Sequence, residues 1–259
     1  NGPMLEVPAI AIYYYNYKAI DDKEDESHFQ NLKQQLFEHG DLFPQSESRD
    51  LYLLAMNYCI RRSNAGVEKY QRELFELFRS GLEKKILLQN GVLSRWTFKN
   101  AVTTGTLQKE FEWTERFIHD FKVYLEPKYR DNFVHFCLAK LYYEKEEFQE
   151  AMGLFSKVDL DDMFLYLDAK TMQLKIYYEL DEFNLLDSLL ESMGTYVRRK
   201  DVIGYHKANY KNMIKFTKKL VHLNPYEQEQ RQKLEKEIQE ANPLTERKWL
   251  LGQISRMAG

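Results

Sequence analysis

The chain has 259 residues, of which 44% are hydrophobic and 30% are charged, a balance typical of a folded globular protein rather than a disordered one. It has only 11 glycines and 6 prolines, fewer than turn-rich β proteins usually need, so helices are favoured. The formal net charge of −3 gives no general reason to expect nucleic acid as a partner.

The N-terminal third predicts helices that are separated by short polar breaks. The stretch AIAIYYYNYKAI precedes an acidic break, DDKEDE at 21–26, and the apolar spacing around Phe29 predicts the next helix. Pro44 follows that helix, as expected of a residue that cannot continue one. Further helices are predicted around Ala55 and from about Val67 to Leu88.

The middle of the chain carries a pattern that recurs with helical spacing. LAKLYYEKEEFQEA at 138–151 is followed by LKIYYELDEFNLLD at 174–187, so Tyr-Tyr-Glu-x-x-Glu-Phe occurs twice. The apolar residues on each side follow three-to-four spacing, and the polar break between them predicts a turn between antiparallel helices. An earlier segment, 95–125, fits more loosely, since Phe111, Thr114 and Ile118 match Phe148, Ala151 and Phe155.

Four positions of the first copy carry a family resemblance. The spacing of Ala139, Tyr142, Ala151 and Phe155 resembles the tetratricopeptide repeat (TPR), in which small and aromatic residues recur within a unit of about 34 residues. Small residues are expected where the two helices of a hairpin approach closely, with aromatic residues filling the gap to the next hairpin. In the second copy the equivalent positions are Leu174, Tyr177, Leu186 and Leu190. It resembles a degenerate unit, because leucine replaces both alanines.

The resemblance implies an all-α fold, an α-solenoid of about seven antiparallel helical hairpins that forms one domain over residues 1–259. The clearest repeats are predicted at 95–131, 132–166 and 167–201. A coiled coil is the competing helical interpretation, and the hairpin-length segments with frequent breaks argue against it.

The C-terminal segment 225–258 is predicted to cap the array. Asn224-Pro225 and Asn242-Pro243 each offer an asparagine cap with proline in the first helical turn. The first of the two helices is mostly polar. A polar-faced pair is what a stack of hairpins needs to shield its last core face.

The sequence gives no positive sign of an enzyme. Phosphate-binding, dinucleotide-binding, hydrolase and zinc-protease motifs are absent, and no cofactor is expected. Two acid–histidine pairs, Glu115 with His119 and Asp131 with His135, have helical spacing, but zinc needs three or four ligands, so no metal is expected. The acidic runs at 21–26 and 159–162 are interpreted as turn and cap residues.

Two cysteines and the absence of a long apolar run bear on the compartment. Cys59 and Cys137 lie in apolar, helix-like surroundings, where buried free thiols are expected. No apolar run is long enough to span a membrane, and no signal peptide is visible in the opening NGPM. We therefore expect a cytoplasmic location, for a whole protein or for the helical-repeat portion of a longer one.

In the TPR pattern the first helix of each hairpin lines a concave groove, so candidate groove residues follow from the register. Lysines and aromatic residues predominate there, and they suit the carboxylates and apolar side chains of a peptide or helix. TPR adaptors that bind chaperone tails hold a terminal carboxylate with lysine and asparagine. The same carboxylate clamp is not predicted for this chain, because lysine occupies positions where the clamp has asparagine. Packing between hairpins and simple solvation are the competing interpretations. The candidates are Arg49, Tyr52, Lys99, Asn100, Phe133, Phe136, Lys140, Tyr143, Lys175 and Tyr178.

A second basic feature follows at 198–220. Lys207, Lys211, Lys215 and Lys218 fall at helical spacing and make a positive stripe. An acidic protein surface suits this stripe better than a phosphate backbone, because no aromatic stacking platform accompanies it. An ordinary solvated helix face is the competing interpretation.

These observations predict a non-enzymatic interaction scaffold that binds a protein or peptide partner in a concave groove, with neither nucleic acid nor membrane as a partner. Two alternatives stay open. One is a TPR-type regulator that changes superhelical pitch when it binds a signalling peptide, although no helix-turn-helix effector is evident. The other is an unrecognised hydrolase on a helical scaffold.

Overall fold

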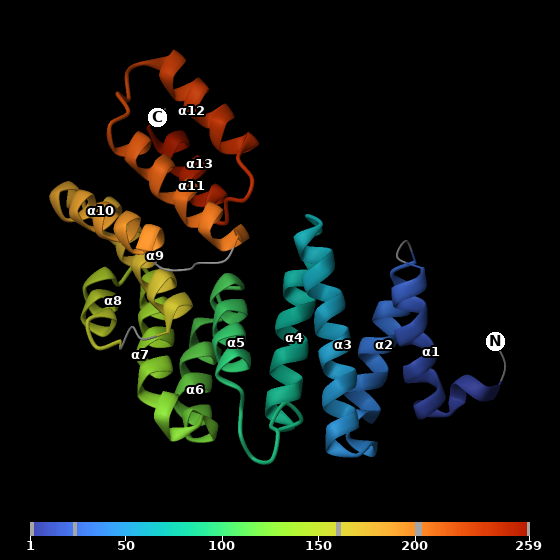
Figure 1. The fold of residues 1–259 in the computed structure, drawn as a ribbon. Helices are drawn as coiled ribbons and strands as arrows, with labels where there is room; N and C mark the ends of the chain where they lie inside the picture. Colours follow the sequence, from blue (N-terminus) through green and yellow to red (C-terminus); the bar gives the residue numbers. More distant parts are fainter. Residues whose placement is uncertain (1–2, 23–24, 159–161, 200–203, 258–259) are drawn as a thin grey trace. The chain divides into compact units, whose positions relative to one another are not determined.

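A computed structural model describes residues 3–22, 25–158, 162–199 and 204–257. In these ranges the fold is entirely helical, with thirteen α-helices and no named strand, so the prediction of an all-α fold is confirmed (Figure 1). The chain divides into two compact units, residues 1–158 and residues 159–259, each of which is described by itself. The prediction of a single domain over 1–259 stays a prediction.

Unit 1 contains four pairs of consecutive helices, each pair packed together (Figure 1). The pattern of contacts also joins α4 to α5, α6 to α7 and α5 to α7. The helix predicted from Val67 to Leu88 ends earlier, because Glu83 is followed by turns. The eight helices are α1 (Pro8–Asp21), α2 (Ser27–His39), α3 (Gln45–Asn64), α4 (Lys69–Glu83), α5 (Arg95–Leu107), α6 (Phe111–Phe121), α7 (Pro127–Glu144) and α8 (Phe148–Phe155). Three short 3₁₀ helices accompany them: η1 (Pro3–Glu6), η2 (Gly40–Leu42) and η3 (Lys122–Tyr124).

Unit 2 is built from five helices around one main apolar core. The core includes Leu174, Leu190, Phe216 and Leu250, each nearly or fully buried. The acidic run at 159–162 lies outside the described residues except for Asp162, which caps its helix as predicted, accepting bonds from the amides of the second and third helical residues at 3.0 and 3.1 Å. The helices are α9 (Met163–Glu179), α10 (Phe183–Arg199), α11 (Gly204–Val221), α12 (Gln228–Glu240) and α13 (Arg247–Arg256).

Both C-terminal helices fall within the predicted 225–258, but neither asparagine caps its helix. The residues that precede α12 and α13 are Glu227 and Glu246. Asn224 instead accepts a bond from the Tyr226 amide at 3.1 Å, which forms a local turn. The Asn-Pro signal thus marks the turns ahead of these helices rather than their first residues.

Four of the helices end in the same hydrogen-bonded turn. After α3, α5, α7 and α9 a single residue adopts a left-handed backbone, and the amide after it donates to the carbonyl five residues earlier, at 2.8 to 3.1 Å. This Schellman turn satisfies carbonyls that the helix end leaves open. The left-handed residues are Gly66, Lys109, Glu146 and Asp181, with φ of 91°, 58°, 63° and 56°.

The two copies of the Tyr-Tyr-Glu motif share their local contacts as well as this turn. The second tyrosine packs on the phenylalanine that opens the next helix, with ring centroids 5.9 Å apart for Tyr143 and Phe148 and 6.1 Å apart for Tyr178 and Phe183. The recurrence in the sequence therefore corresponds to a recurring piece of structure.

Small residues lie between the paired helices, as the spacing predicts. Ala139 of α7 and Ala151 of α8 are fully buried, and Phe155 packs against Phe136 with ring centroids 6.2 Å apart. In the preceding pair, Gly105 of α5 lies so close to Thr114 of α6 that there is no room for a Cβ atom. A close approach of the two helices therefore depends on small side chains in both pairs.

Ion pairs connect successive helix pairs of unit 1. Lys33 of α2 contacts Glu76 of α4 at 2.7 Å, and Arg72 of α4 pairs with Glu110, which precedes α6. Glu115 of α6 accepts a bond from Lys145, just past α7, at 2.8 Å. This bond, which outweighs the opposing effect of burial, lowers the pKa of Glu115.

Acidification is therefore expected to weaken unit 1. The folded pKa of Glu115 lies below its unfolded value of about 4.3, so its contribution to stability is present above that pH and is lost as the pH falls through the folded pKa. Urea unfolding between about pH 5 and pH 3 should show a falling free energy, less steep in Glu115→Gln. Glu112→Gln, at an exposed position of the same helix, is the matched control. An unchanged slope in Glu115→Gln would contradict the assignment.

Candidate functional site

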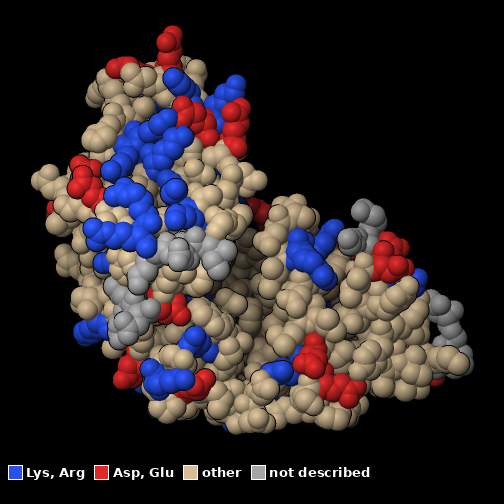
Figure 2. All heavy atoms as spheres, in the orientation of Figure 1, with Lys and Arg blue, Asp and Glu red and all other residues tan. Residues whose placement is uncertain are grey.

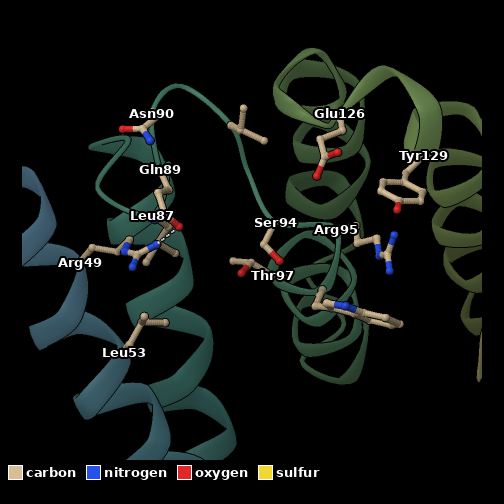
Figure 3. A pocket seen from close by; sticks show the side chains of 12 residues that line it. Arg49, Leu53, Leu87, Gln89, Asn90, Ser94, Arg95, Thr97, Glu126 and Tyr129 are labelled. Carbon is tan, nitrogen blue, oxygen red and sulfur yellow. Dashed lines mark hydrogen bonds between the residues drawn. The ribbon is translucent and has the colours of Figure 1, made fainter.

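A cavity of about 570 Å³ opens in unit 1 beside the first helices of three successive pairs, α3, α5 and α7 (Figure 3). The loop between α4 and α5 closes one side of it. Its wall mixes apolar, hydroxyl, amide and charged side chains. The lining residues are Arg49, Leu53, Leu87, Gln89, Asn90, Val92, Ser94, Arg95, Trp96, Thr97, Glu126 and Tyr129.

The loop that closes the cavity is held by a tight reversal at Asn90-Gly91. Both residues have positive φ, 52° and 78°, as a type I′ turn requires and as the Asn-Gly pair favours. Two backbone bonds, at 2.8 and 3.0 Å, join Gln89 and Val92 across this turn. The Leu93 amide then donates to the Tyr124 carbonyl of η3 at 2.8 Å. The loop therefore presents Gln89 and Asn90 from a fixed backbone.

Two arginines line the cavity from opposite sides, and the Arg95 side chain is turned toward Tyr129 (Figure 3). Arg49 of α3 donates to the Gln89 side chain at 2.7 Å, which orients its guanidinium. Arg95, the first residue of α5, lies 3.9 Å from the centre of the Tyr129 ring and 5.2 Å from that of Trp96. Phe133 lies 5.8 Å away as well, so cation–π contact with three rings holds the second guanidinium in place.

The electrostatic character of the cavity is mixed, with the cationic side stronger. Bonds from Lys128 and Arg95 lower the pKa of Tyr129, which shows that its hydroxyl lies in a positive field. Glu126 supplies one carboxylate to the cavity and contacts Lys128 at 3.5 Å. Two guanidiniums and one carboxylate line the cavity, and Asp50, outside the lining, contacts Arg49 at 3.5 Å. The lining itself suits a ligand that carries at least one negative group.

The wall combines apolar surface with polar and charged groups, which suits the binding of a ligand. Neither histidine nor cysteine is among the described residues that line it, so no hydroxyl there has a neighbouring imidazole base. Leu53, Leu87 and Val92 give an apolar surface, and Trp96 keeps 38% of its surface exposed. A peptide side chain with an apolar body and a carboxylate tip fits both features.

The structure places the predicted groove residues in different surroundings. Arg49 lines the cavity. Lys99 lies nearby, its ammonium 5.7 Å from the Trp96 ring and 5.5 Å from the Phe136 ring, and Asn100 is exposed on the same helix.

Three aromatic candidates are core residues, which corrects their expected place in a groove. Tyr52, Phe133 and Phe136 are at most 1% exposed. The Tyr52 ring packs against Gly40 and Gly81, and its hydroxyl is 2.9 Å from that of Ser80. These rings fill the space between helices, the alternative that the sequence left open.

The four residues from the repeated motif are engaged within their own units. Lys140 and Tyr143 belong to unit 1, where the lysine lies 3.8 Å from Glu144. Lys175 and Tyr178 belong to unit 2, where the lysine pairs with Glu246 at 2.7 Å and burial raises the pKa of the tyrosine to about 12. That these residues bind a partner stays a prediction.

The cavity contains residues that sequence reasoning missed, chiefly Arg95, Trp96 and Tyr129. The available signal was local: Asn90-Gly91 predicts a tight reversal, and an arginine–tryptophan pair opens the helix that follows it. Tyr129 lies one helical turn before the buried Phe133 on the same side of α7, and the two rings pack with centroids 6.4 Å apart. It is half-buried in the first turn of the helix, where the core ends.

One group of possible metal ligands occurs in the part of the chain that the structure describes. Ligand atoms of Asp22, Asp25 and His28 lie within 4.8 Å of one another at the turn between α1 and α2. Both carboxylates are exposed, and Asp25 accepts a bond from the Ser27 amide at 2.9 Å, so turn formation explains its position. Glu115, which has helical spacing to His119, accepts a bond from Lys145 at 2.8 Å.

Both cysteines are buried free thiols, as predicted. Burial raises the pKa of Cys137 to about 12 and also raises that of Cys59, so neither is poised as a thiolate. Of the helices described, none has the length and apolar character that a membrane crossing needs.

Comparison with known proteins returned no match: no protein-family model, curated protein or solved structure resembles this chain significantly.

Proposed function

We propose that this chain is a non-enzymatic, TPR-like interaction protein whose helix pairs form a solenoid, and that it binds an acidic peptide segment in the cavity beside α3, α5 and α7. The single observation that carries the proposal is the pair of arginines, Arg49 and Arg95, on opposite walls of a cavity that also has an apolar surface. The repeated turn and the small residues between paired helices support the scaffold.

The location of the cavity agrees with how helical-hairpin scaffolds bind. The first helices of successive pairs line the binding face of such scaffolds, and the cavity draws its helical residues from α3, α5 and α7. A peptide carboxylate would bond to one guanidinium, and an adjacent apolar side chain would cover Leu53 or Trp96.

Selection from a random dodecapeptide library displayed on phage tests this proposal. The selected peptides should carry Asp or Glu beside an apolar residue. Arg49→Glu and Arg95→Glu should each weaken their binding about tenfold or more, since a charge-assisted bond is replaced by repulsion. Arg116→Glu, at an exposed position of α6 outside the cavity, makes the same charge change and should bind normally.

Circular dichroism melting of all three variants separates lost binding from lost folding. A library that yields no binders, or selected peptides that bind both cavity variants normally, would refute the proposal.

A further inference from the structure

Helix α11 of unit 2 carries a row of lysines on its outer side. Asn209 and Tyr210 point inward, where Asn209 accepts a bond from the Thr245 amide at 2.8 Å and Tyr210 donates to Asp168 of α9 at 3.1 Å. Lys211, Lys215 and Lys218 are exposed, and α11 contains no acidic residue. Figure 2 shows lysine and arginine side chains gathered over α10 and α11. Three of the four lysines of the predicted stripe therefore form a basic face, whereas Lys207 is half-buried and lines neither hollow beside this helix.

Two hollows flank α11 and meet at Lys218. The hollow between α10 and α11 has a volume of about 460 Å³, and the hollow between α11 and α12 about 550 Å³. Six cationic side chains but only two carboxylates, Glu191 and Glu237, line them. The cationic residues are Arg198, Lys211, Lys215, Lys218, Lys219 and Lys233. This excess of positive charge occurs in a chain whose formal net charge is −3.

One carboxylate of the protein itself, that of Glu237, already lies among the lysines of the second hollow. Glu237 accepts a bond from Lys219 at the wall of the second hollow. That bond, together with the charges of Lys215 and Lys233, lowers the pKa of Glu237. A carboxylate placed among these lysines is therefore held in its charged form.

Both hollows also have an apolar floor. Leu190, Val197 and Ile214 line the first, and Leu223 and Leu234 line the second. Among the described residues that line the hollows, His222 supplies an imidazole ring, and there is no Phe, Tyr or Trp on which a base could stack. A cationic rim around an aliphatic floor matches a segment that alternates carboxylates with apolar side chains, better than it matches a uniformly charged phosphate backbone.

We propose that the two hollows flanking α11 form a second interaction surface, which binds an acidic amphipathic segment of a partner protein. The partner's apolar residues contact Ile214 and Leu234, and its carboxylates pair with Lys211, Lys215 and Lys218. The lysines steer the partner to the surface, and the aliphatic floor selects against ligands that offer charge alone. This surface is independent of the cavity in unit 1, since the two share no residue.

Fluorescence anisotropy with four defined probes tests the proposal at about physiological salt. The probes are a labelled 16-residue peptide with Glu and Leu at amphipathic helical spacing, the same peptide with every Leu replaced by Ser, a 16-nucleotide single-stranded DNA, and vesicles containing phosphatidylserine. The Glu/Leu peptide should bind at least tenfold more tightly than the Glu/Ser peptide. The triple variant K211E/K215E/K218E should lose at least tenfold of that affinity.

The matched control is K109E/K157E/K236E, which reverses three exposed lysines outside both hollows. It should bind the Glu/Leu peptide within about twofold of the unaltered chain. Equal binding of the two peptides, equal binding by the two triple variants, or tighter binding of the DNA or the vesicles would each overturn the proposal. Peptides selected on the unit 1 cavity should bind K211E/K215E/K218E normally, so the failure of one surface is distinguishable from the failure of the other.

Discussion

Gly105→Ala is expected to lower the free energy of unfolding of unit 1 by about 2 kcal/mol. A Cβ atom at this position of α5 would overlap the Thr114 hydroxyl of α6 and lie 3.4 Å from the Trp113 ring. Thr114 cannot easily give way, since it is fully buried and donates to the Glu110 carbonyl at 2.8 Å. The added methyl group must therefore separate the two helices or break this bond.

Gly153→Ala is the matched control, because it makes the same change in a helix of the same unit. No atom lies within 4 Å of the Cβ position there, and alanine is the better helix former, so the variant should gain about 0.5 to 1 kcal/mol. Urea unfolding followed by circular dichroism measures both. A Gly105→Ala variant as stable as Gly153→Ala would show that the two helices do not depend on this contact.

A double variant isolates the overlap from general effects on α5. Thr114→Ala removes the hydroxyl that the new methyl group would meet, so Gly105→Ala should cost less in its presence than alone. Equal costs in both backgrounds would place the effect of Gly105→Ala elsewhere than at Thr114.

The helices and their repetition could be predicted from the sequence because both depend on local patterns. Three-to-four spacing marks a helix wherever one side of it is buried, and the Tyr-Tyr-Glu motif marks the end of α7 and of α9. A turn after the motif was predicted, but its left-handed residue was not, because only Gly66 among the four left-handed residues is a glycine. Lys109, Glu146 and Asp181 adopt that backbone because the hydrogen-bonded turn offsets its cost.

The binding face was harder to predict, because it depends on the rotation of each helix about its axis. Arg49 and Leu53, four residues apart, reach the cavity, while Tyr52 lies in the core. On α7 the difference lies along the helix instead: Tyr129, in the first turn, lines the cavity, and Phe133, one turn later on the same side, is buried. Sequence spacing identified which helices line the face. It did not identify which side of each helix is exposed, because aromatic residues occur on both sides.

Glu179→Ala is expected to destabilise the packing of α13 in unit 2 by about 2 to 3 kcal/mol. Glu179, the last residue of α9, accepts bonds from three side chains of α13: Trp249 at 3.2 Å, Gln253, and Arg256 at 2.9 Å. Gln253 is only 4% exposed, so removal of the carboxylate leaves its amide without this acceptor in a dry environment.

Glu144→Ala is the control that the repeat itself supplies, since Glu144 and Glu179 hold the same position in the two copies of the motif. The ion pair of Glu144 is a single contact with Lys140, one helical turn away, at 3.8 Å, and such pairs contribute about 0.3 to 0.5 kcal/mol. One motif position thus predicts a large effect in one copy and a small effect in the other.

Hydrogen–deuterium exchange measures the two effects separately, because each is read in its own unit. Amides of α13 should exchange about 30- to 140-fold faster in Glu179→Ala, the equivalent of about 2 to 3 kcal/mol, whereas those of α7 should change little in Glu144→Ala. Similar exchange of α13 in Glu179→Ala and the unaltered chain would show that the aliphatic core around Leu250 and Ile254 holds this helix without the carboxylate. Faster exchange would instead show that the glutamate of the second motif copy holds α13 in place. The two copies would then differ because of the residues that pack against each of them.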